Sequence, residues 1–552
     1  MTGGGLPDRG AGGGARPTVG GVQSQQARQR GNLDESKKLH CKGVSLILPD
    51  CVEMLSGSKE SLAKWMDQRE WLWNVLRYLS TGMRQRTANG CPQHHMRAND
   101  VPVMLRGGLI EQVERKEVRG FVKMFLHDEP SKDRYRPIRN CEDFNSATSR
   151  QICGQVNMAR KDQVVEAVHY GDYMLQLDFA AMFDQFELAP AVRNLFCFRD
   201  GSSYFRLKTL PMGIRTAVGV AGACTERLLD FEKRSRAMSI IDNVLFVGSK
   251  EDVLHDARIF VDRVNFIGAT LNEDTSDLEA LVEQRGTWGG IDIDLVSKTV
   301  QLSSKSVAKT EFSWAGRETW TWRQFACHIG LLWWSVGIVD IDLSLYFPLL
   351  RFISVVSRRM MDEDARWEQK AVIWPSAWPY IERWTAIALR NEPRVVPPLC
   401  ETPKWTVATD ACRYGWGFVA VDEAGRGYTY GARWYADFVA RHGEIKMRRS
   451  TFTESHAIIC SLCKLLKHEK QPTSVLVLTD SSVAVASYTR AFNSHSYDVN
   501  ECLSRLRQLM PQHQIRFEHI AGAQNPADWF SRNPGAFASE ERRETAIRGL
   551  RR

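Results

Sequence analysis

The sequence of 552 residues has no apolar run approaching the roughly 20 residues that a membrane span requires. Its first 30 residues are rich in Gly, Gln and Arg and have no apolar core, so we expect no secretory signal. The 13 cysteines are odd in number and scattered without a disulfide framework. These absences argue against a membrane-embedded chain and against a disulfide-stabilised secreted domain. We therefore expect an intracellular protein, cytoplasmic or nuclear, in a reducing compartment.

What is present is a globular composition, with 43% hydrophobic and 25% charged residues. The length is too great for one hydrophobic core and predicts roughly three to four domains. A net charge of +8 suits a polyanionic partner but is a weak signal over this length. Residues 1–39 contain glycine runs and few apolar side chains, and they are predicted to be a disordered basic tail that either tethers RNA or is only solvated.

The first candidate catalytic acid lies in the stretch Ser239–Gly248. Two apolar, β-branched runs flank a polar pair, Asp242 and Asn243. This pattern predicts a β-hairpin whose turn carries the polar pair. A carboxylate there stands clear of the sheet, where a metal and a phosphate can reach it. Asp-Asn is also simply a good turn former, an interpretation that needs no function.

A second acid-bearing stretch lies upstream. Leu175–Phe179 alternates like a strand and carries Asp178 near its end. Between the two stretches, Leu-Pro-Met-Gly at 210–213 precedes a helix of small residues at 217–226. In this order the stretches resemble the palm of reverse transcriptases, which implies that Asp178 and Asp242 are catalytic aspartates.

The same resemblance gives roles to three further residues. It implies that Phe183 screens the sugar 2′ position of the nucleotide, and that Met212 and Gly213 lie against the template and the incoming nucleotide. The match departs from the family at Ile240, where an aromatic is usual, and at Asn243, where a second aspartate is usual. An amide oxygen can coordinate Mg²⁺ but brings no charge, so metal binding should weaken. The hypothesis is that Asp178 and Asp242 still hold the metals, with Asn243 as a neutral catalytic helper.

Gly120–Asn145 predicts two strands joined by a charged hairpin, and it resembles the fingers of reverse transcriptases. Arg136 is predicted to bind the phosphates of the incoming nucleotide, because a guanidinium can bind phosphate through two hydrogen bonds. Lys132 is a second candidate. The alternative for Arg136 is a surface ion pair.

Three segments follow the hairpin. Asp252–Leu271 predicts an amphipathic helix that ends near Gly268, and Thr287–Asp294 with Thr299–Leu302 predicts a strand hairpin that resembles the family's primer grip. Thr319–Met361 is helical and apolar, and its place in the order implies the thumb and connection. Prolines between Pro375 and Pro403 then indicate a linker.

A second module starts at Trp405. Its strands and helices carry four acids: Asp410 and Asp480 near the ends of strands, Glu454 at the start of a helix, and Asp528 at the start of the last helix. In this order they resemble the four acids of ribonuclease H. Many cellular members carry a histidine in the loop before the last acid, whereas residues 521–525 have none, and His519 lies in a strand.

The resemblance implies the chemistry of both modules. Carboxylates suit hard cations, so each active site is predicted to hold two Mg²⁺ or Mn²⁺ ions, bound by Asp178 and Asp242 in one site and by the four acids in the other. Two such ions, roughly 3.5–4 Å apart, stabilise the attacking and leaving oxygens of a phosphoryl displacement. The implied partners are an RNA template, a DNA primer, an RNA–DNA hybrid and deoxynucleoside triphosphates.

Histidine and cysteine suggest two weaker metal sites. Cys91, His94 and His95 have no second ligand pair nearby. His456, Cys460 and Cys463 share one helical face but spread over roughly 10 Å of helix, so packing explains them better than zinc.

The predicted fold class is a multidomain α+β and α/β chain, with a right-hand polymerase of fingers, palm and thumb followed by a ribonuclease H-like α/β domain. The predicted boundaries are 1–39 for the tail, 40–115 for an N-terminal helical segment that includes a helix at 61–83, 116–305 for fingers and palm, 306–402 for thumb, connection and linker, 403–535 for ribonuclease H, and 536–552 for a basic tail.

The implied function is an RNA-directed DNA polymerase with ribonuclease H activity from a retroelement. The sequence at 525–532 and Met212 resemble tyrosine-recombinase (DIRS-like, VIPER-like) elements more than retroviruses. One alternative is a catalytically dead nucleic-acid-binding protein, for which Asn243 is the best support. Another is a ribonuclease H with an inert palm.

Overall fold

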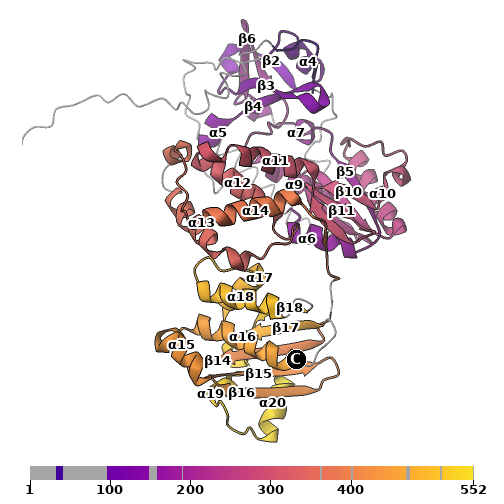
Figure 1. Cartoon of the computed structure of the whole chain (residues 1–552). Helices are drawn as coiled ribbons and strands as arrows, with labels where there is room; N and C mark the ends of the chain where they lie inside the picture. The colour runs from indigo at the N-terminus through magenta and orange to yellow at the C-terminus, as the bar shows by residue number, and fades with distance from the viewer. Residues whose placement is uncertain are drawn as a thin grey trace, which may run out of the picture. The chain divides into compact units, whose positions relative to one another are not determined.

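The computed structural model describes residues 33–40, 96–147, 158–188, 190–360, 364–398, 402–467, 473–509 and 513–550. The helix predicted at 61–83, the residues Cys91, His94 and His95, and residues 1–32 lie outside these ranges. The chain is a mixed α/β protein of several domains (Figure 1). Among the described helices, none combines the length and the apolar character that crossing a membrane would require.

Contacts divide the chain into two compact units. The first comprises Met1–Ala159, Leu175–Phe246 and Glu251–Val282, and the second comprises Arg160–Met174, Val247–Lys250 and Glu283–Arg552. Each unit has its own sheets and its own buried core.

Three small sheets belong mostly to the first unit. The predicted charged hairpin is present as β3 (Lys123–Glu129) antiparallel to β4 (Arg134–Asn140), and β1 (Lys38–Leu39) runs parallel to β4. A second sheet has the order β2–β7–β6. The third has the order β5–β9–β8, with β9 in the centre. The bounds of these strands are Ile110–Val113 for β2, Tyr173–Asp178 for β5, Cys197–Asp200 for β6, Ser203–Leu207 for β7, Arg236–Ile240 for β8 and Asn243–Gly248 for β9.

Helix α10 (Lys250–Phe266) buries its apolar side against the third sheet. The ring of Phe260 lies 6.1 Å from the ring of Phe179 and 5.9 Å from that of Phe246. The helix ends where the sequence predicted, near Gly268, which adopts a φ of +71°, a conformation that ends a helix readily because glycine has no Cβ. The other helices of this unit are α4 (Asp100–Arg106), α5 (Glu142–Ala147), α7 (Met182–Gln185), α8 (Pro190–Arg193) and α9 (Ala217–Leu228).

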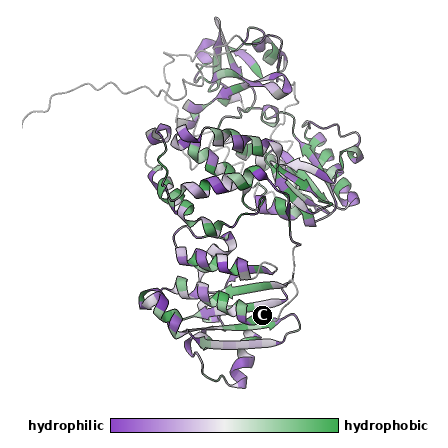
Figure 2. Cartoon of the chain, in the orientation of Figure 1, coloured by the Kyte–Doolittle hydropathy of each residue, from purple (hydrophilic) through white to green (hydrophobic). Residues whose placement is uncertain are grey.

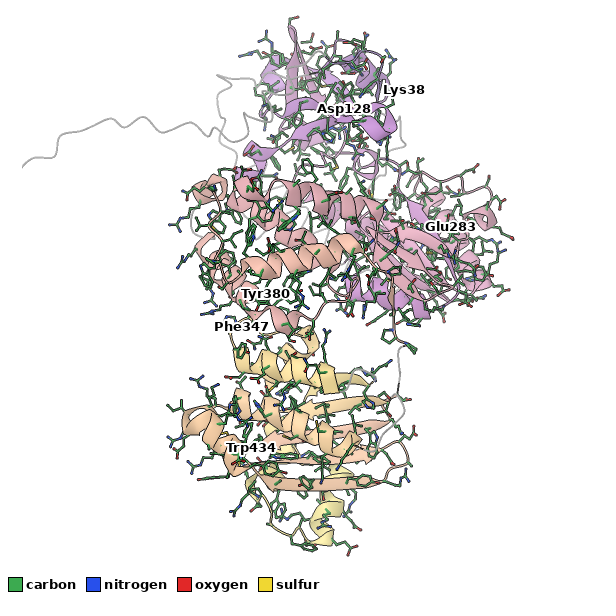
Figure 3. All side chains as sticks on the ribbon, in the orientation of Figure 1. Lys38, Asp128, Glu283, Phe347, Tyr380 and Trp434 are labelled. Carbon is green, nitrogen blue, oxygen red and sulfur yellow. The ribbon has the colours of Figure 1, made fainter. Side chains whose placement is uncertain are left out.

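Two predicted boundaries in this unit need correction. Residues 33–39 were assigned to the disordered tail, but Lys37 Nζ lies 2.7 Å from Asp128 Oδ1, and β1 pairs with β4 beside it (Lys38 and Asp128 are labelled in Figure 3). Residues 40–115 were predicted to be helical, but β2 pairs with β7. Both segments find their partners far away in sequence, which local composition does not reveal.

The second unit begins with an antiparallel sheet, β10–β11–β12–β13. The predicted hairpin is present as β11 antiparallel to β12, but its first segment is divided, because Gly289 and Gly290, with φ of +59° and +82°, form a two-residue turn between β10 and β11. The bounds are Arg285–Trp288 for β10, Ile291–Asp294 for β11, Thr299–Leu302 for β12 and Arg394–Val395 for β13. This unit also contains α6 (Lys161–Glu166).

Four helices occupy the residues that were predicted to be thumb, connection and linker, and two of them lie in the predicted helical stretch 319–361. They are α11 (Ser304–Ala315), α12 (Trp322–Ser335), α13 (Phe347–Met360) and α14 (Trp378–Arg390). The prediction that 375–403 is a linker was wrong for α14, because its proline stands in the first helical turn, where a missing N–H costs nothing. Buried His328 joins three of these helices, with its ring 3.2 Å from Ser313 Oγ and 3.0 Å from Thr385 Oγ1.

The C-terminal domain has a five-stranded sheet of order β16–β15–β14–β17–β18. Strands β16, β15 and β14 are antiparallel, and β14, β17 and β18 are parallel. The bounds are Trp405–Ala411 for β14, Gly415–Asp422 for β15, Gly427–Arg433 for β16, Ser474–Thr479 for β17 and Gln514–His519 for β18. The central strands are largely hydrophobic (Figure 2), as expected for a sheet covered on both faces.

Helices cover the two faces of this sheet. Val407 and Phe418 belong to a core shared with α16 (Ser450–Leu466), α17 (Ser482–Arg490) and α18 (Tyr497–Leu509), whereas Ala408 and Val419 face α19 (Asp528–Arg532) and α20 (Glu540–Leu550). Successive residues of a strand point to opposite faces, so the two sets of helices lie on opposite sides. Residues 536–552 were predicted to be a basic tail, but α20 buries Leu550 against the sheet. Helix α15 (Ala436–Met447) was not predicted.

Candidate active sites

The first site forms where β5 meets the hairpin of β8 and β9. Asp178 is the last residue of β5, and Asp242 lies in the turn between β8 and β9. The N–H of Phe179 donates to the backbone carbonyl of Asp242 (3.1 Å), which fixes the end of β5 beside the turn. The structure therefore brings together the two acids that the sequence pattern paired.

The charges of this site are coupled. Burial, together with the nearby charges of Asp242 and Glu273, raises the pKa of Asp178 to about 6, while the Asn272 hydrogen bond and the charge of Lys132 oppose the rise. Burial also raises the pKa of Asp242, against the charge of Arg136. Two half-buried carboxylates that repel each other make a site that a divalent cation would stabilise.

Amide groups hold the carboxylate of Asp178. Asn243 Nδ2 donates to Oδ1 (3.2 Å) and Asn272 Nδ2 donates to Oδ2 (2.8 Å). The backbone N–H of Asp178 donates to Glu273 Oε2 (2.9 Å). Sequence reasoning missed Asn272 and Glu273; the only signal was a polar run directly after the helix that packs behind the hairpin.

The turn itself is strained. Ile241 has a φ of +58°, a conformation that β-branched residues rarely adopt. The buried hydroxyl of Thr225 on α9 donates to the carbonyl of Ile241 (2.6 Å) and holds it there. Such strain costs on the order of 1–3 kcal/mol and is typical of functional turns.

Both predicted phosphate-binding residues act on this site through their positive charges. Arg136 on β4 and Lys132 in the turn before it lower the pKa of Asp242 and Asp178, respectively. The alternative prediction for Arg136, an ion pair, is observed, because its Nη2 lies 2.9 Å from Glu129 Oε1. Its buried Nε has no hydrogen-bond partner among the described residues.

The other predicted palm residues lie around the same unit. Phe183 on α7 is half-buried and packs on the main core, and Met212 is exposed. Gly213 passes close to β4, since a Cβ there would lie 2.7 Å from the carbonyl oxygen of Arg139. The carbonyl of Gly213 also accepts a hydrogen bond from Asn145 Nδ2 (2.7 Å), which ties this loop to α5.

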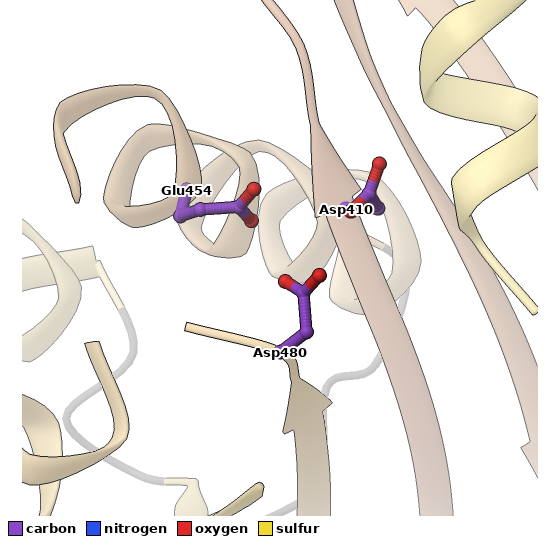
Figure 4. A group of neighbouring side chains, drawn as sticks. All are labelled: Asp410, Glu454 and Asp480. Atoms are coloured by element: carbon purple, nitrogen blue, oxygen red, sulfur yellow. The ribbon is translucent and has the colours of Figure 1, made fainter. Parts of the chain in front are cut away.

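The second site lies at one edge of the five-stranded sheet. Asp410 on β14, Glu454 on α16 and Asp480 directly after β17 offer carboxylate oxygens that all lie within 4.8 Å of one another. Figure 4 shows these side chains converging from three elements. They converge because β14 and β17 are parallel neighbours, so the acids at their carboxyl ends meet at the same edge. Trp434, labelled in Figure 3, donates its Nε1–H to the carbonyl of Cys412 (2.9 Å) and holds the loop after β14.

These acids are strongly coupled. Burial, together with the charges of Asp410 and Asp480, raises the pKa of Glu454 to about 9. Burial raises the pKa of Asp410 to about 6, opposed by the hydroxyl of Ser531, which donates to Asp410 Oδ2. Glu454 Oε1 accepts from the N–H of Ala411 (3.2 Å), but the buried Oε2 has no hydrogen-bond partner among the described residues. An unpaired buried oxygen beside two further carboxylates is the donor set that a hard divalent cation prefers.

Asp528 does not join this group. Its Oδ1 accepts from Arg532 Nε (2.6 Å), one helical turn along α19. Its charge still raises the pKa of Asp410, so it lies nearby. Of the four predicted acids, three converge, and the fourth is paired with the side chain of Arg532.

The histidines and cysteines behave as packing residues. His456 Nδ1 lies 2.9 Å from the carbonyl of Phe452, and its ring packs against the rings of Phe438 on α15 and Phe452 on α16, at 5.0 Å and 4.3 Å between centroids. Within the described residues, Asp410, Glu454 and Asp480 form the one group of three or more close potential metal ligands, so the zinc interpretation finds no support. His519 Nε2 lies 3.1 Å from the carbonyl of Asp480.

No protein-family model and no curated protein matches this chain. Its fold is similar to solved structures of a foamy viral protease-reverse transcriptase. A form designated dRH, in complex with double-stranded DNA, is 12% identical, with 90% of this chain and 85% of that chain covered and a TM-score of 0.45. A complex with an RNA/DNA hybrid is 13% identical, with 86% of this chain and 63% of that chain covered and a TM-score of 0.42.

Proposed function

We propose that this chain is an RNA-directed DNA polymerase with an attached ribonuclease H, which copies retroelement RNA into DNA and degrades the RNA strand of the hybrid. The observation that carries the proposal is the convergence of Asp410, Glu454 and Asp480 at one sheet edge. The pair Asp178 and Asp242, whose carboxylates feel the charges of Lys132 and Arg136, supports the polymerase half.

In the ribonuclease site, Asp410, Glu454 and Asp480 would hold Mg²⁺ or Mn²⁺, two ions per site, with Asp528 at the margin. Bound cations would lower the pKa of a water molecule and stabilise the leaving oxygen of the RNA strand. Until a cation binds, Glu454 keeps its proton near neutral pH, because its pKa is about 9. Glu454 would therefore release this proton on becoming a metal ligand.

In the polymerase site, Asp178 and Asp242 would hold the cations, and the two basic residues would bind the triphosphate of a deoxynucleotide. Arg136 suits this task because its Nε is buried without a partner, so a phosphate oxygen would satisfy it. Asn243 keeps the carboxylate of Asp178 oriented through its amide N–H. The proposed substrates are an RNA template with a DNA primer. The proposed source of the chain is a retroelement of the tyrosine-recombinase type.

Two assays on the full chain test the proposal. Primer extension on an RNA template, with Mg²⁺ or Mn²⁺, measures the polymerase, and cleavage of a labelled RNA–DNA hybrid measures the ribonuclease. Asp178→Asn should abolish extension and leave cleavage intact, whereas Asp480→Asn should do the reverse. If Asp178→Asn still extends the primer and Asp480→Asn still cleaves the hybrid, the assignment of the two sites is wrong.

A ribonuclease H with an inert palm is the second candidate, and Asn243 favours it, because its side chain donates to Asp178 and adds no charge. It predicts hybrid cleavage without extension by the wild type. In that case Asn243→Asp should restore extension if the second carboxylate is all that the palm lacks.

A further inference from the structure

The segment that follows α10 is built around Asp178. Asn272 contacts Asp178 twice: its backbone N–H donates to the carbonyl of Asp178 (2.8 Å), and its side-chain Nδ2 donates to Oδ2 (2.8 Å). Glu273 Oε2 accepts from the backbone N–H of Asp178 (2.9 Å). Two adjacent residues therefore engage the N–H, the carbonyl and the carboxylate of one acid.

This segment is itself fixed. The N–H of Ala180 donates to the carbonyl of Thr270 (3.0 Å). The buried side chain of Gln185 donates to both the carbonyl of Ala180 (2.7 Å) and that of Thr270 (2.9 Å), and it accepts from the N–H of Thr270 (2.9 Å). Because Gln185 hydrogen-bonds to both segments, the backbone that carries Asn272 and Glu273 is held beside the backbone that follows Asp178.

The hydrogen bonds on Asp178 leave room for a cation. Each carboxylate oxygen has two acceptor positions, and each oxygen of Asp178 accepts one amide hydrogen bond, from Asn243 on one side and Asn272 on the other. Both donors are neutral, so the negative charge is kept. A carboxylate whose orientation is fixed in advance loses less conformational freedom when it binds a metal.

We propose that Asn272 and Glu273 are positioning residues for the polymerase site, which hold Asp178 in the conformation that binds the divalent cation. The inference rests on the proposed polymerase function. It also explains how a site with Asn243 in place of a second acid could retain a metal: the chain orients the carboxylate that it has.

The test measures metal binding directly, in the full chain. Asp410→Asn and Asp480→Asn first remove the ribonuclease site, and Mn²⁺ affinity is then measured by electron paramagnetic resonance. Adding Asn272→Ala or Glu273→Ala to this background should weaken Mn²⁺ binding by about 10–100-fold, the range typical of residues that orient metal ligands. Glu273→Gln keeps an acceptor for the N–H of Asp178 and should lose less affinity than Glu273→Ala.

Asp274→Asn is the matched control. Asp274 is the exposed neighbour of Glu273, and its Oδ1 accepts from the N–H of Ser276 (3.0 Å), a bond that asparagine can keep. Its Mn²⁺ affinity should equal that of the background. If Asn272→Ala lowers the unfolding temperature, Asn272→Leu keeps the branching of this exposed side chain at Cγ while removing the side-chain donor, and its Mn²⁺ affinity decides the question.

The possible failures are distinguishable. If Asp178→Asn abolishes Mn²⁺ binding but the Asn272 and Glu273 variants bind like the background, the positioning role is wrong and the polymerase site stands. If Asp178→Asn leaves Mn²⁺ binding unchanged, the proposed polymerase site is wrong, and the inference falls with it.

Discussion

Replacing Glu454 by glutamine should stabilise the protein near neutral pH when divalent metals are chelated. Glu454 is 5% exposed, and its pKa is about 9 against an ordinary value of 4.5. In the unfolded chain the carboxyl ionises freely above pH 4.5, whereas in the folded chain it keeps its proton. The contribution of this carboxyl group to the free energy of unfolding is therefore fully present below pH 4.5 and is lost progressively as the pH rises towards 9.

The size of the effect follows from this difference. Each pH unit between the two values costs about 1.4 kcal/mol, so from pH 5 to pH 7 the wild type should lose about 2.7 kcal/mol through this group. Glutamine cannot ionise, and its carbonyl can still accept from the N–H of Ala411. For a domain of this size, such a difference corresponds to about 5–10 °C in unfolding temperature.

Calorimetry in a chelating buffer, at pH 5 and pH 7, measures this prediction on the full chain. Glu454→Gln should gain stability over the wild type at pH 7 and little at pH 5. Glu423→Gln, an exposed glutamate of the same domain, serves as the control and should follow the wild type. Adding Mg²⁺ should raise the unfolding temperature of the wild type more than that of Glu454→Gln. Parallel stability curves for the wild type and Glu454→Gln would refute the reasoning.

Three further predictions concern other parts of the chain. Burial lowers the pKa of His328 to about 4, so the wild type should lose about 1.4 kcal/mol per pH unit as the pH falls from 6.5 towards 4, and His328→Gln should remove this slope in urea unfolding. Gly213→Ala should slow primer extension and leave hybrid cleavage unchanged, because its Cβ would press on the backbone of β4. The buried carboxylate of Asp256 accepts from two backbone N–H groups and one hydroxyl in the loop before β8, so Asp256→Ala should cost about 3 kcal/mol in urea unfolding.

The strands that carry the acids could be predicted because their signal is local. Alternating apolar residues followed by one acid describe both β5 with Asp178 and β14 with Asp410, and the polar pair between two β-branched runs describes the hairpin of β8 and β9. Parallel pairing of β14 and β17 then places Asp410 near Asp480, as the order of the elements implied.

The residues that support these acids could not be predicted in the same way. Asn272 reaches Asp178 across 94 positions, and Ser531 reaches Asp410 across 121. Nothing in the local sequence of either residue specifies such a partner, since the contact depends on how α10 and α19 pack. The same reason explains α20, whose charged composition suggested a free tail although Leu550 is buried against the sheet.

A common feature separates the acids suited to a metal from the other acids nearby. Asp178 accepts hydrogen bonds from two amides, and Asp410 accepts one from a hydroxyl. None of these three neutral donors cancels the negative charge of the carboxylate. Asp184, close in sequence to Asp178, instead forms an ion pair with an arginine, and so does Asp528. An acid with a cationic partner must give up that partner, or share its charge, before it binds Mg²⁺, whereas an acid oriented by neutral donors does not. On this ground Asp528 is the least suited of the four proposed ribonuclease acids to hold a metal, and Asp410, Glu454 and Asp480 are the expected metal ligands.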